Sequence, residues 1–317
     1  MKQSLKDILG IKYPVIMAPM FLVTNARMMI EACNAGIAAA VPALNYRTDE
    51  EFRAALDEVR EKTEGSGSIG VNLIVNKSNP KMPGQLQTCL DKKIDFIITS
   101  LGSPESVIKA CKPHGIKVFC DVTDLKYAKK VESLGADALI AVNSRAGGHA
   151  GNIPPEELIP LLNENCTIPV ISAGGVGNKE DLDRILGLGA AGVSVGSIFI
   201  ASEESGVSED YKKACVDYGK DDIVMSTKIS GTPCTVINTP YVQKIGTKQN
   251  WFEKLLSKSK RLKKWVKMLT FARGMKKLEN AAFSATYKTV WCAGPTIENT
   301  DKIKPVKEIV KDLVRDE

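Results

Sequence analysis

Histidine is nearly absent from this chain, which has only two imidazole side chains, His114 and His149, among 317 residues. Because histidine is the side chain whose pKa normally lies near neutrality, proton transfer has few candidates here. Cysteine pairs are absent too: the eight cysteines are scattered, and none forms a Cys-x-x-Cys motif. This spacing excludes the common cysteine zinc motifs and predicts free, buried thiols in a reduced protein without a metal site.

Long apolar runs are also missing. No segment approaches the roughly 18 consecutive apolar residues that a membrane-spanning helix needs, and no long apolar region follows the charged start of the chain at residues 1–7. Apolar residues make up 44% and charged residues 25% of the composition, as in ordinary globular proteins with a large core. These absences predict a cytoplasmic protein without a signal peptide or a membrane span.

Short apolar segments and amphipathic segments alternate from residue 14 to about residue 200. The apolar segments, which we expect to be strands, are Pro14–Met20, Gly36–Ala43, Ser68–Ile74, Phe96–Gly102, Lys117–Val122, Ala138–Asn143, Pro169–Gly174 and Gly192–Ile200. The amphipathic segments, which we expect to be helices, are Asn25–Ala35, Asp49–Lys62, Pro80–Asp91, Ser103–Lys112, Asp124–Leu134, Pro155–Asn163, Asn178–Leu188 and Glu203–Val216. Strands that are apolar throughout are typical of a parallel sheet covered on both faces.

The alternation predicts an α/β fold, a (β/α)8 TIM barrel over residues 1–220, followed by a C-terminal extension over residues 221–317 that packs on the barrel mouth. An open, doubly wound sheet is the alternative, but eight consecutive units of similar length favour closure. Gly36, Gly115, Gly135 and Gly189 each follow an expected helix and are predicted to cap it. Since ligands bind at the carboxyl ends of barrel strands, the residues that end the apolar segments form the candidate site.

Glycines gather at the ends of the last three expected strands. The sixth strand is followed by Ala146-Gly147-Gly148-His149-Ala150-Gly151, where the glycines leave the backbone open to a ligand beside His149. The same hexapeptide also fits a simple tight turn. Gly174-Gly175 and Val195-Gly196-Ser197 end the next two strands, where barrels commonly bind phosphate through backbone N–H groups. The pattern predicts a phosphate-bearing ligand, which could be FMN, another phosphorylated cofactor or a sugar phosphate.

Five segments, in this order, resemble one family. They are Met17-Ala18-Pro19-Met20, Gly70-Val71-Asn72-Leu73, the hexapeptide at 146–151, Pro169–Gly175 and Gly189–Ser197. On these segments the chain resembles the nitronate monooxygenases, long called 2-nitropropane dioxygenases, a family that includes the FMN-dependent enoyl-acyl-carrier-protein reductases. The resemblance covers roughly residues 5–240 and returns at Trp291-Cys292-Ala293-Gly294.

The resemblance implies that FMN binds across the barrel mouth. Ala18, Pro19 and Met20 would form a shelf against the isoalloxazine ring. Asn72 would hydrogen-bond to the edge of the ring, with a role in capping the strand end as the alternative. The other implied cofactor-binding residues, mostly around the phosphate and the ribityl chain, are Asp121, Gly147, Gly148, Gly174, Gly175, Val195, Gly196 and Ser197.

His149 matches the histidine that this family places at the flavin. In a nitronate monooxygenase it would remove the acidic α-proton of a nitroalkane or bind the nitronate, and O2 would reoxidise the flavin. In an enoyl reductase, which uses NAD(P)H, it would assist hydride delivery and stabilise the enolate. We expect the first reaction, with the second as the alternative and a barrel that only binds a phosphate ligand as the non-enzymatic alternative. His114 lies at a helix end away from the strand carboxyl ends, so we expect no catalytic role for it.

Arg145 and Ser144 are the candidates for contacts with a small-molecule substrate. The family often has a glutamate where this chain has Arg145, so the local charge is inverted. The arginine is consistent with an acidic or phosphate-bearing substrate, with a structural ion pair, or with a side chain that points to solvent. Pro295 likewise stands where the family commonly has a glutamine, and the identity of the substrate is not predicted.

Positive charge is concentrated in residues 244–277. Ten lysines and two arginines against the single acid Glu253 give this segment +11, whereas the whole chain carries +6. Apolar residues at helical spacing from Trp251 to Leu269 predict an amphipathic helix, and the family resemblance implies that it covers the flavin as a lid. Its basic face is a solvated surface, a docking site for an anionic carrier (an acyl-carrier protein or coenzyme A), or a contact with an anionic membrane surface or nucleic acid. We expect no nucleic-acid partner. A last short helix is expected within residues 303–317.

Overall fold

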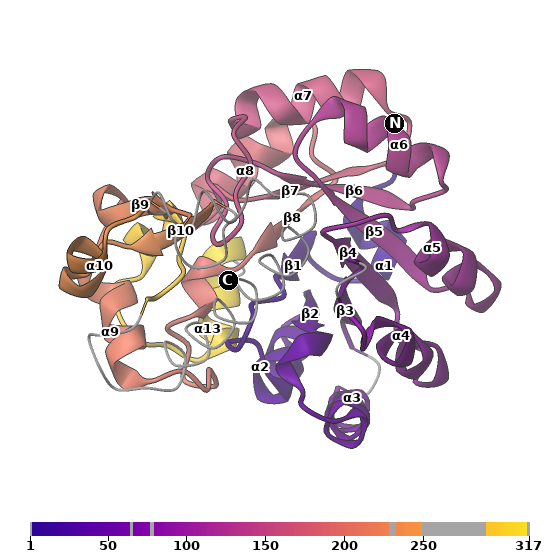
Figure 1. Cartoon of the computed structure of the whole chain (residues 1–317), viewed down its shortest axis with the longest axis horizontal. Coiled ribbons are helices and arrows are strands. Elements are labelled where there is room, and N and C mark those ends of the chain that lie inside the picture. The colour runs from indigo at the N-terminus through magenta and orange to yellow at the C-terminus, as the bar shows by residue number, and fades with distance from the viewer. Residues whose placement is uncertain (1, 64–65, 77–78, 228–232, 249–289, 316–317) are drawn as a thin grey trace, which may run out of the picture.

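The computed structural model shows eight parallel strands closed into a barrel (Figure 1). It describes residues 2–315 except 64–65, 77–78, 228–232 and 249–289. Each strand pairs with the next, and the strands are β1 (Val15–Met17), β2 (Ala38–Pro42), β3 (Ser68–Ile74), β4 (Phe96–Ser100), β5 (Lys117–Val122), β6 (Ala138–Val142), β7 (Val170–Ala173) and β8 (Gly192–Val195). β8 pairs back onto β1, with Val193 beside Val15. The predicted (β/α)8 fold is therefore confirmed.

Helices surround the barrel in the expected order (Figure 1). They are α2 (Ala26–Asn34), α3 (Asp49–Lys62), α4 (Met82–Asp91), α5 (Glu105–Cys111), α6 (Leu125–Ser133), α7 (Pro155–Asn165) and α8 (Lys179–Gly187), and the turns η1 (Ala43–Asn45) and η2 (Lys112–His114) follow β2 and α5. The four glycines expected to follow helices have the left-handed backbone that such caps need, with φ of +87° at Gly36, +69° at Gly115, and +93° at Gly135 and Gly189. Each returns the chain toward the sheet, as predicted.

Two expected elements differ from the structure in their bounds more than the others do. The eighth strand was expected to reach Ile200, but β8 ends at Val195 and Ser197–Phe199 form a 3-10 turn, η3. The residues of this turn are as buried as those of a strand, so their apolar character did not indicate that the strand ends at Val195. The helix expected from Glu203 begins only at Glu209, as α9 (Glu209–Asp217), because the Ser208 side chain accepts a hydrogen bond from the Tyr211 N–H and caps it there.

Side chains inside and outside the barrel alternate along each strand. Ile16, Ala38 and Ile98 belong to the inner cluster, whereas their sequence neighbours Met17 and Ala39 belong to the outer one. The rings of Phe96 and Phe119 stack inside with their centroids 5.3 Å apart. Gly70 makes room for them, since a Cβ there would lie 2.3 Å from the Phe96 ring. The interior of the barrel is thus filled by side chains, and a ligand is expected at the end of the barrel.

A short helix that sequence reasoning missed, α1 (Leu5–Leu9), closes the amino-terminal end of the barrel. Leu5 is fully buried in the inner cluster, and its backbone N–H donates to the carbonyl oxygen of Ala191 at 2.8 Å. A Cβ on Gly192 would lie 2.5 Å from the Leu5 side chain. The glycine at the start of β8 therefore allows α1 to seal this end, which leaves the carboxyl end of the barrel for the site.

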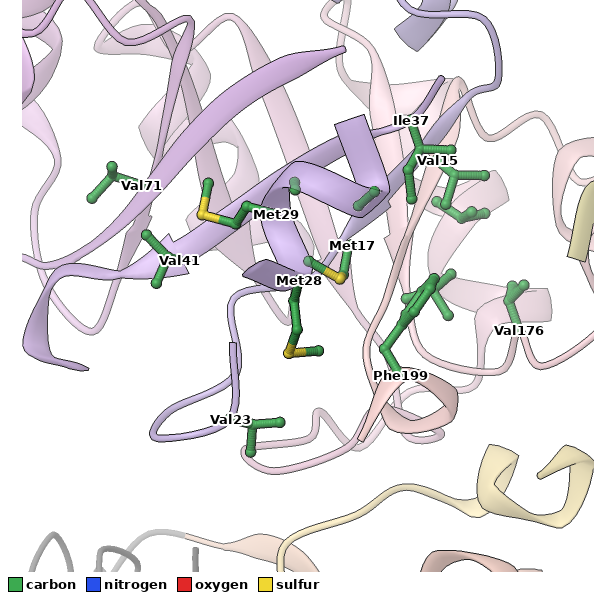
Figure 2. Close-up of a cluster of buried hydrophobic side chains, with 14 of the residues drawn as sticks. Val15, Met17, Val23, Met28, Met29, Ile37, Val41, Val71, Val176 and Phe199 are labelled. Atoms are coloured by element: carbon green, nitrogen blue, oxygen red, sulfur yellow. The ribbon is translucent and has the colours of Figure 1, made fainter. Parts of the chain in front are cut away.

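The layer between barrel and helices is the largest part of the core. Met28 and Met29 of α2 are fully buried with Met17 of β1 and Val41 of β2 (Figure 2). Burial of a side chain of this size contributes about 1.5–3 kcal/mol. These contacts hold each helix against its strands and so fix the positions of the strand ends.

The chain beyond the barrel forms a small hairpin and three further helical elements. After the turn η4 (Lys220–Asp222), β9 (Ile223–Ser226) pairs antiparallel with β10 (Cys234–Ile237); α10 (Pro240–Ile245), η5 (Pro295–Asn299) and α13 (Val306–Val314) complete the described part. The expected last helix is found as α13. It packs between α2 and α8, and its Val306 and Leu313 join the same hydrophobic cluster as the barrel. The extension therefore shares the barrel's core.

The amphipathic helix expected at Trp251–Leu269 lies outside the described residues, as does the basic segment beyond Lys248. Of the helices in the described ranges, none is long and apolar enough to span a bilayer.

Candidate active site

A cavity of about 330 Å³ lies at the carboxyl ends of the strands. The predicted site residues that line it are Ala18, Pro19, Met20, Asn72, Asp121, Arg145, Gly147, Gly148, His149, Gly174, Val195, Gly196 and Ser197. Ser144 and Gly175 are the two predicted residues that do not line the cavity. The Ser144 backbone N–H donates to the carbonyl oxygen of Ile153 at 2.9 Å. Gly175, with φ of +80°, forms the turn that follows Gly174. Residues that follow strands far apart in the sequence therefore lie together around one cavity, as the barrel topology predicted.

The loop that carries His149 is organised by Asn143, which is fully buried at the end of β6. The Asn143 side-chain amide donates to the carbonyl oxygen of Gly174 at 3.0 Å, and its Oδ1 accepts from the backbone N–H of Arg145 at 2.8 Å. The Asn143 carbonyl oxygen accepts from both Ala146 and Gly151 at 3.2 Å. Gly151 is required for this closure, because a Cβ there would lie 2.3 Å from the carbonyl oxygen of Val142. The hexapeptide is thus a tight loop, and that loop directs His149 to the cavity.

His149 lines the cavity and is exposed, but it lies close to enough protein atoms to be partly desolvated. Desolvation by these surroundings lowers the pKa of His149 below its ordinary value. The imidazole is therefore neutral at pH 7 and can accept a proton from a ligand in the cavity. The other histidine, His114, is exposed at the end of η2, which precedes β5 and so lies at the opposite end of the strands.

Backbone N–H groups collect at the ends of β7 and β8. Among the hydrogen bonds between described residues, none uses the backbone N–H of Gly174, Gly196 or Ser197. A Cβ on Gly174 would lie 2.4 Å from the Ala146 nitrogen, and its φ is +106°, so only glycine fits there. A group of N–H donors on adjoining loops is the arrangement that binds phosphate oxygens without a charged side chain.

A hydrogen-bond chain crosses the ends of β3, β4 and β5. The Asn72 side-chain amide donates to the Ser100 hydroxyl at 2.7 Å, and Ser100 donates to the Asp121 carboxylate. All three residues line the cavity. Burial raises the pKa of Asp121 to about 6, although the hydrogen bond from Ser100 works against that rise. The chain fixes the orientation of Asn72 and places a carboxyl group that titrates close to neutral pH behind it.

The C-terminal extension supplies the remaining wall. The Gly294 backbone N–H donates to the Ser197 hydroxyl at 2.9 Å. A Cβ on Gly147 would lie 2.8 Å from that hydroxyl oxygen and 3.0 Å from the Gly294 nitrogen. Close by in sequence, Trp291 is fully buried and its ring lies parallel to that of Tyr211, 5.6 Å between centroids. The glycines at 147 and 294 therefore let the extension approach the histidine loop.

Arg145 lines the cavity, but its guanidinium group forms an ion pair with Glu156. Its Nη1 lies 2.8 Å from Glu156 Oε1, and Arg184 contacts the same oxygen at 2.6 Å. Burial alone would raise the pKa of Glu156, but hydrogen bonds and the charges of Arg145 and Arg184 outweigh it and lower that pKa. Of the possibilities open for Arg145, the structure shows the ion pair.

Many lining residues were not among the predicted site residues; those with polar or reactive side chains or from beyond the barrel include Ser100, Tyr211, Cys234, Val290 and Cys292. Ser100 ends β4 and lies near the end of the expected strand Phe96–Gly102, so its position could have indicated a role. The other four come from the extension or from α9. Cys292 lies in the segment 291–294 where the family resemblance returns, but no local motif marks Tyr211, Cys234 or Val290. In the described part of the chain, no three His, Cys, Asp or Glu side chains are grouped in a way that could hold a metal ion.

Known proteins resemble this chain over most of its length. The family model described as nitronate monooxygenase matches residues 80–316. A (3aS,4S,5R,7aS)-5-hydroxy-7a-methyl-1-oxo-octahydro-1H-indene-4-carboxyl-CoA dehydrogenase of Rhodococcus jostii is 29% identical over 245 residues, 77% of this chain and 68% of that protein. A probable nitronate monooxygenase of Staphylococcus aureus is 27% identical over 288 residues, 77% of this chain and 80% of that protein.

The fold agrees with the sequence comparison. The structure of FabK from Thermotoga maritima superimposes with a TM-score of 0.84 at 27% identity, covering 99% of this chain and 96% of FabK. The family match covers well over half of the chain. The chain belongs to the nitronate monooxygenase family of oxidoreductases.

Proposed function

We propose that the chain is an FMN-dependent oxidoreductase of the nitronate monooxygenase type, which oxidises alkyl nitronates or nitroalkanes with O2 and uses His149 as its base. One observation carries the proposal: a neutral histidine lies on the same cavity as a group of backbone N–H donors that hydrogen-bond to no described residue. The donors suit a phosphate group, and the histidine suits abstraction of a carbon-bound acidic proton.

The residues present fit FMN. The N–H groups of Gly174, Gly196 and Ser197 would hold the phosphate, and Gly147 and Gly148 would lie along the ribityl chain. Asn72 would meet the polar edge of the ring, and residues 18–20 would pack against its face. Bound FMN would supply the redox chemistry, by accepting two electrons from the substrate and passing them to O2.

The protein's own contribution to the reaction is binding and proton transfer. In the proposed reaction the neutral ring of His149 takes the α-proton of the nitroalkane, and the loop built on Asn143 keeps the ring at the cavity. Arg145 takes no part, because its charge is paired with Glu156. The walls from the extension limit the access of water to the reacting carbon.

An FMN titration followed by an oxygen-uptake assay tests the proposal. The purified protein should show a flavin spectrum or acquire one with added FMN, and O2 uptake should depend on a nitroalkane or nitronate. Gly174→Ala should weaken FMN binding at least tenfold, because its Cβ would collide with the backbone of Ala146. Gly84→Ala is the matched control, since a Cβ at Gly84 on α4 meets nothing within 4 Å. A protein that never takes up FMN contradicts the proposal.

A second candidate is an NAD(P)H-dependent reductase of enoyl thioesters. It is favoured by the likeness to FabK, which extends over both chains almost completely, since the family resemblance includes the FMN-dependent enoyl-acyl-carrier-protein reductases. In that case the basic segment 244–277 would serve as the docking site for the anionic carrier, an acyl-carrier protein or coenzyme A. Anaerobic mixing of the FMN-loaded protein with NADH, NADPH or a nitronate separates the two. Fast bleaching by a pyridine nucleotide, followed by turnover of an enoyl thioester, would replace the first proposal with the second.

A further inference from the structure

Two cysteines in the wall of the cavity have no part in the proposed reaction. Cys234 lies on β10, and Cys292 follows Val290 and Trp291, where the described chain resumes after residues 249–289. Both side chains line the cavity. The Cys234 thiol donates to the carbonyl oxygen of Ser226 at 3.4 Å, and the two thiols lie close enough for each to shift the pKa of the other.

The framework around the pair holds the sulfurs together. The Ile237 backbone N–H donates to the Trp291 carbonyl oxygen at 2.9 Å, which ties β10 to the returning chain. Cys234 is buried, 3% exposed, in a small cluster with Val236, Val242 and Val290, and the half-buried Cys292 packs against the same cluster. The contact between the thiols therefore follows from backbone pairing and packing on both sides.

The environment of this pair differs from that of the cysteines in the barrel. Burial raises the pKa of Cys33, Cys111 and Cys120 to about 12, which keeps these three as unreactive thiols. The hydrogen bond from Cys292, by contrast, lowers the pKa of Cys234. We therefore assign Cys234 as the attacking thiol and Cys292, which is half-buried beside it, as the resolving thiol.

We propose that Cys234 and Cys292 form a reversible disulfide when the protein meets a hydroperoxide, so that the cavity wall contains a redox-modification site. The Cys234 thiolate attacks one peroxide oxygen, the O–O bond breaks, and water leaves with a proton, which makes Cys234 a sulfenic acid. The Cys292 sulfur then attacks the Cys234 sulfur, and a second water leaves. Two thiols lose two electrons and two protons, and one hydrogen peroxide becomes two waters.

The disulfide would join positions 58 residues apart (292 − 234) and remove both thiols from the cavity surface. It would add a covalent bond to the backbone pairing that already holds β10 beside residue 291. Neither step requires the proposed nitroalkane chemistry, so the disulfide can be tested independently of the proposed function.

Peptide mapping of the full-length protein after treatment with hydrogen peroxide tests the proposal. Met225, which is 42% exposed, serves as the internal control for the amount of hydrogen peroxide. Its conversion to the sulfoxide shows that enough oxidant was present. The thiol count of the unfolded protein should fall from eight to six (8 − 2) and return to eight with dithiothreitol. Non-reducing digestion should yield one peptide pair containing Cys234 and Cys292, lighter by two hydrogen atoms than the separate peptides.

Single-cysteine variants distinguish a specific disulfide from general oxidation of the protein's thiols. In Cys292→Ser, the Cys234 sulfenic acid should persist and be trapped by dimedone, whereas Cys166→Ser, a change at a buried cysteine elsewhere in the barrel, should leave the disulfide intact. The wild-type map needs no variant, so a misfolded substitution does not obscure the result. A thiol count that stays at eight while Met225 oxidises overturns the proposal, and so does a disulfide between other cysteines or between two chains.

Discussion

Thr235 of β10 donates its backbone N–H to the carbonyl oxygen of Gly148 at 2.8 Å, and its hydroxyl donates to the carbonyl oxygen of Ala146 at 3.2 Å. Both acceptors belong to the loop that carries His149. Thr235 is buried, so water does not compete for these bonds. The hairpin beyond the barrel thus holds the histidine loop from the outside, while Asn143 holds it from the end of β6.

Replacing Thr235 with Val should loosen this attachment. The backbone bond to Gly148 survives, but the hydroxyl bond is lost and leaves the Ala146 carbonyl without that donor, at a cost of about 1 kcal/mol in the free energy of unfolding. Turnover should fall more than FMN affinity, because the histidine loop moves whereas Gly174, Gly196 and Ser197, which would hold the phosphate, do not. Urea unfolding and steady-state kinetics measure both effects. Thr300→Val is the control, since the buried Thr300 hydroxyl has no hydrogen-bond partner in the described structure; equal losses in the two variants would contradict this account.

His149→Ala should lower turnover of a neutral nitroalkane by about 10²–10⁴-fold, the usual contribution of a general base. FMN should still bind. The wild-type rate should rise with pH through the pKa of His149 and then level off, with that midpoint below the ordinary histidine value because desolvation lowers the pKa. The variant should lack this limb of the profile. His114→Ala, at the exposed end of η2, should behave like wild type; a profile unchanged in His149→Ala would remove the histidine from the reaction.

Asp121 should make the protein less stable as the pH rises from about 4 to 7. Its pKa is about 6 in the folded protein and 3.8 ordinarily, so between these values the folded state binds more protons than the unfolded state. The stability contribution is therefore full below the unfolded pKa and lost as the pH rises through the folded one. The limit is about 3 kcal/mol, at about 1.4 kcal/mol per pH unit.

Asp121→Asn should flatten this pH dependence, because the amide has no proton to release over the range and its oxygen can still accept from Ser100. Urea unfolding of the ligand-free protein between pH 4.5 and 7.5 measures it. Asp183→Asn, with a side chain 60% exposed, should retain the wild-type slope. If both aspartate variants keep that slope, Asp121 is not the titrating group.

Arg145→Met should change catalysis little. The ion pair with Glu156 is about two-fifths exposed on each side, and such pairs contribute about 0–1 kcal/mol. Arg184 continues to hold Glu156, and the methionine stem keeps the packing beside Gly175. We expect kcat/KM for nitroalkanes within about threefold of wild type. A selective rise in KM for anionic substrates would show instead that the guanidinium leaves Glu156 to bind them.

Local signals predicted the bounds of several elements. β3 (Ser68–Ile74), β5 (Lys117–Val122) and α3 (Asp49–Lys62) were expected with these ends. α3 begins where the Thr48 side chain accepts from the Glu51 N–H, which is a signal contained within four residues. β8 was overextended because Ile198 and Phe199 are buried whether the backbone is a strand or a turn. α1 was missed, since five residues that close the barrel carry too short a pattern to recognise.

The residues of the candidate site also divide into those that the sequence predicted and those that it did not. His149, Asn72 and the glycines were found because barrel topology brings strand ends together, and strand ends can be read along the chain. Ser100 was passed over although it ends a strand. Tyr211 and Cys234 had no local signal, because they reach the cavity only after α9 and the extension fold back onto the barrel.

By itself, the sequence determined the closed barrel, the end at which ligands bind and the loop that carries His149, because these follow from periodicity and from glycine positions along the chain. Only the tertiary structure decided that His149 is neutral, that Arg145 is paired with Glu156 and that Cys234 and Cys292 line the same cavity. Those properties depend on desolvation and on distances between residues far apart in sequence, which no local pattern contains.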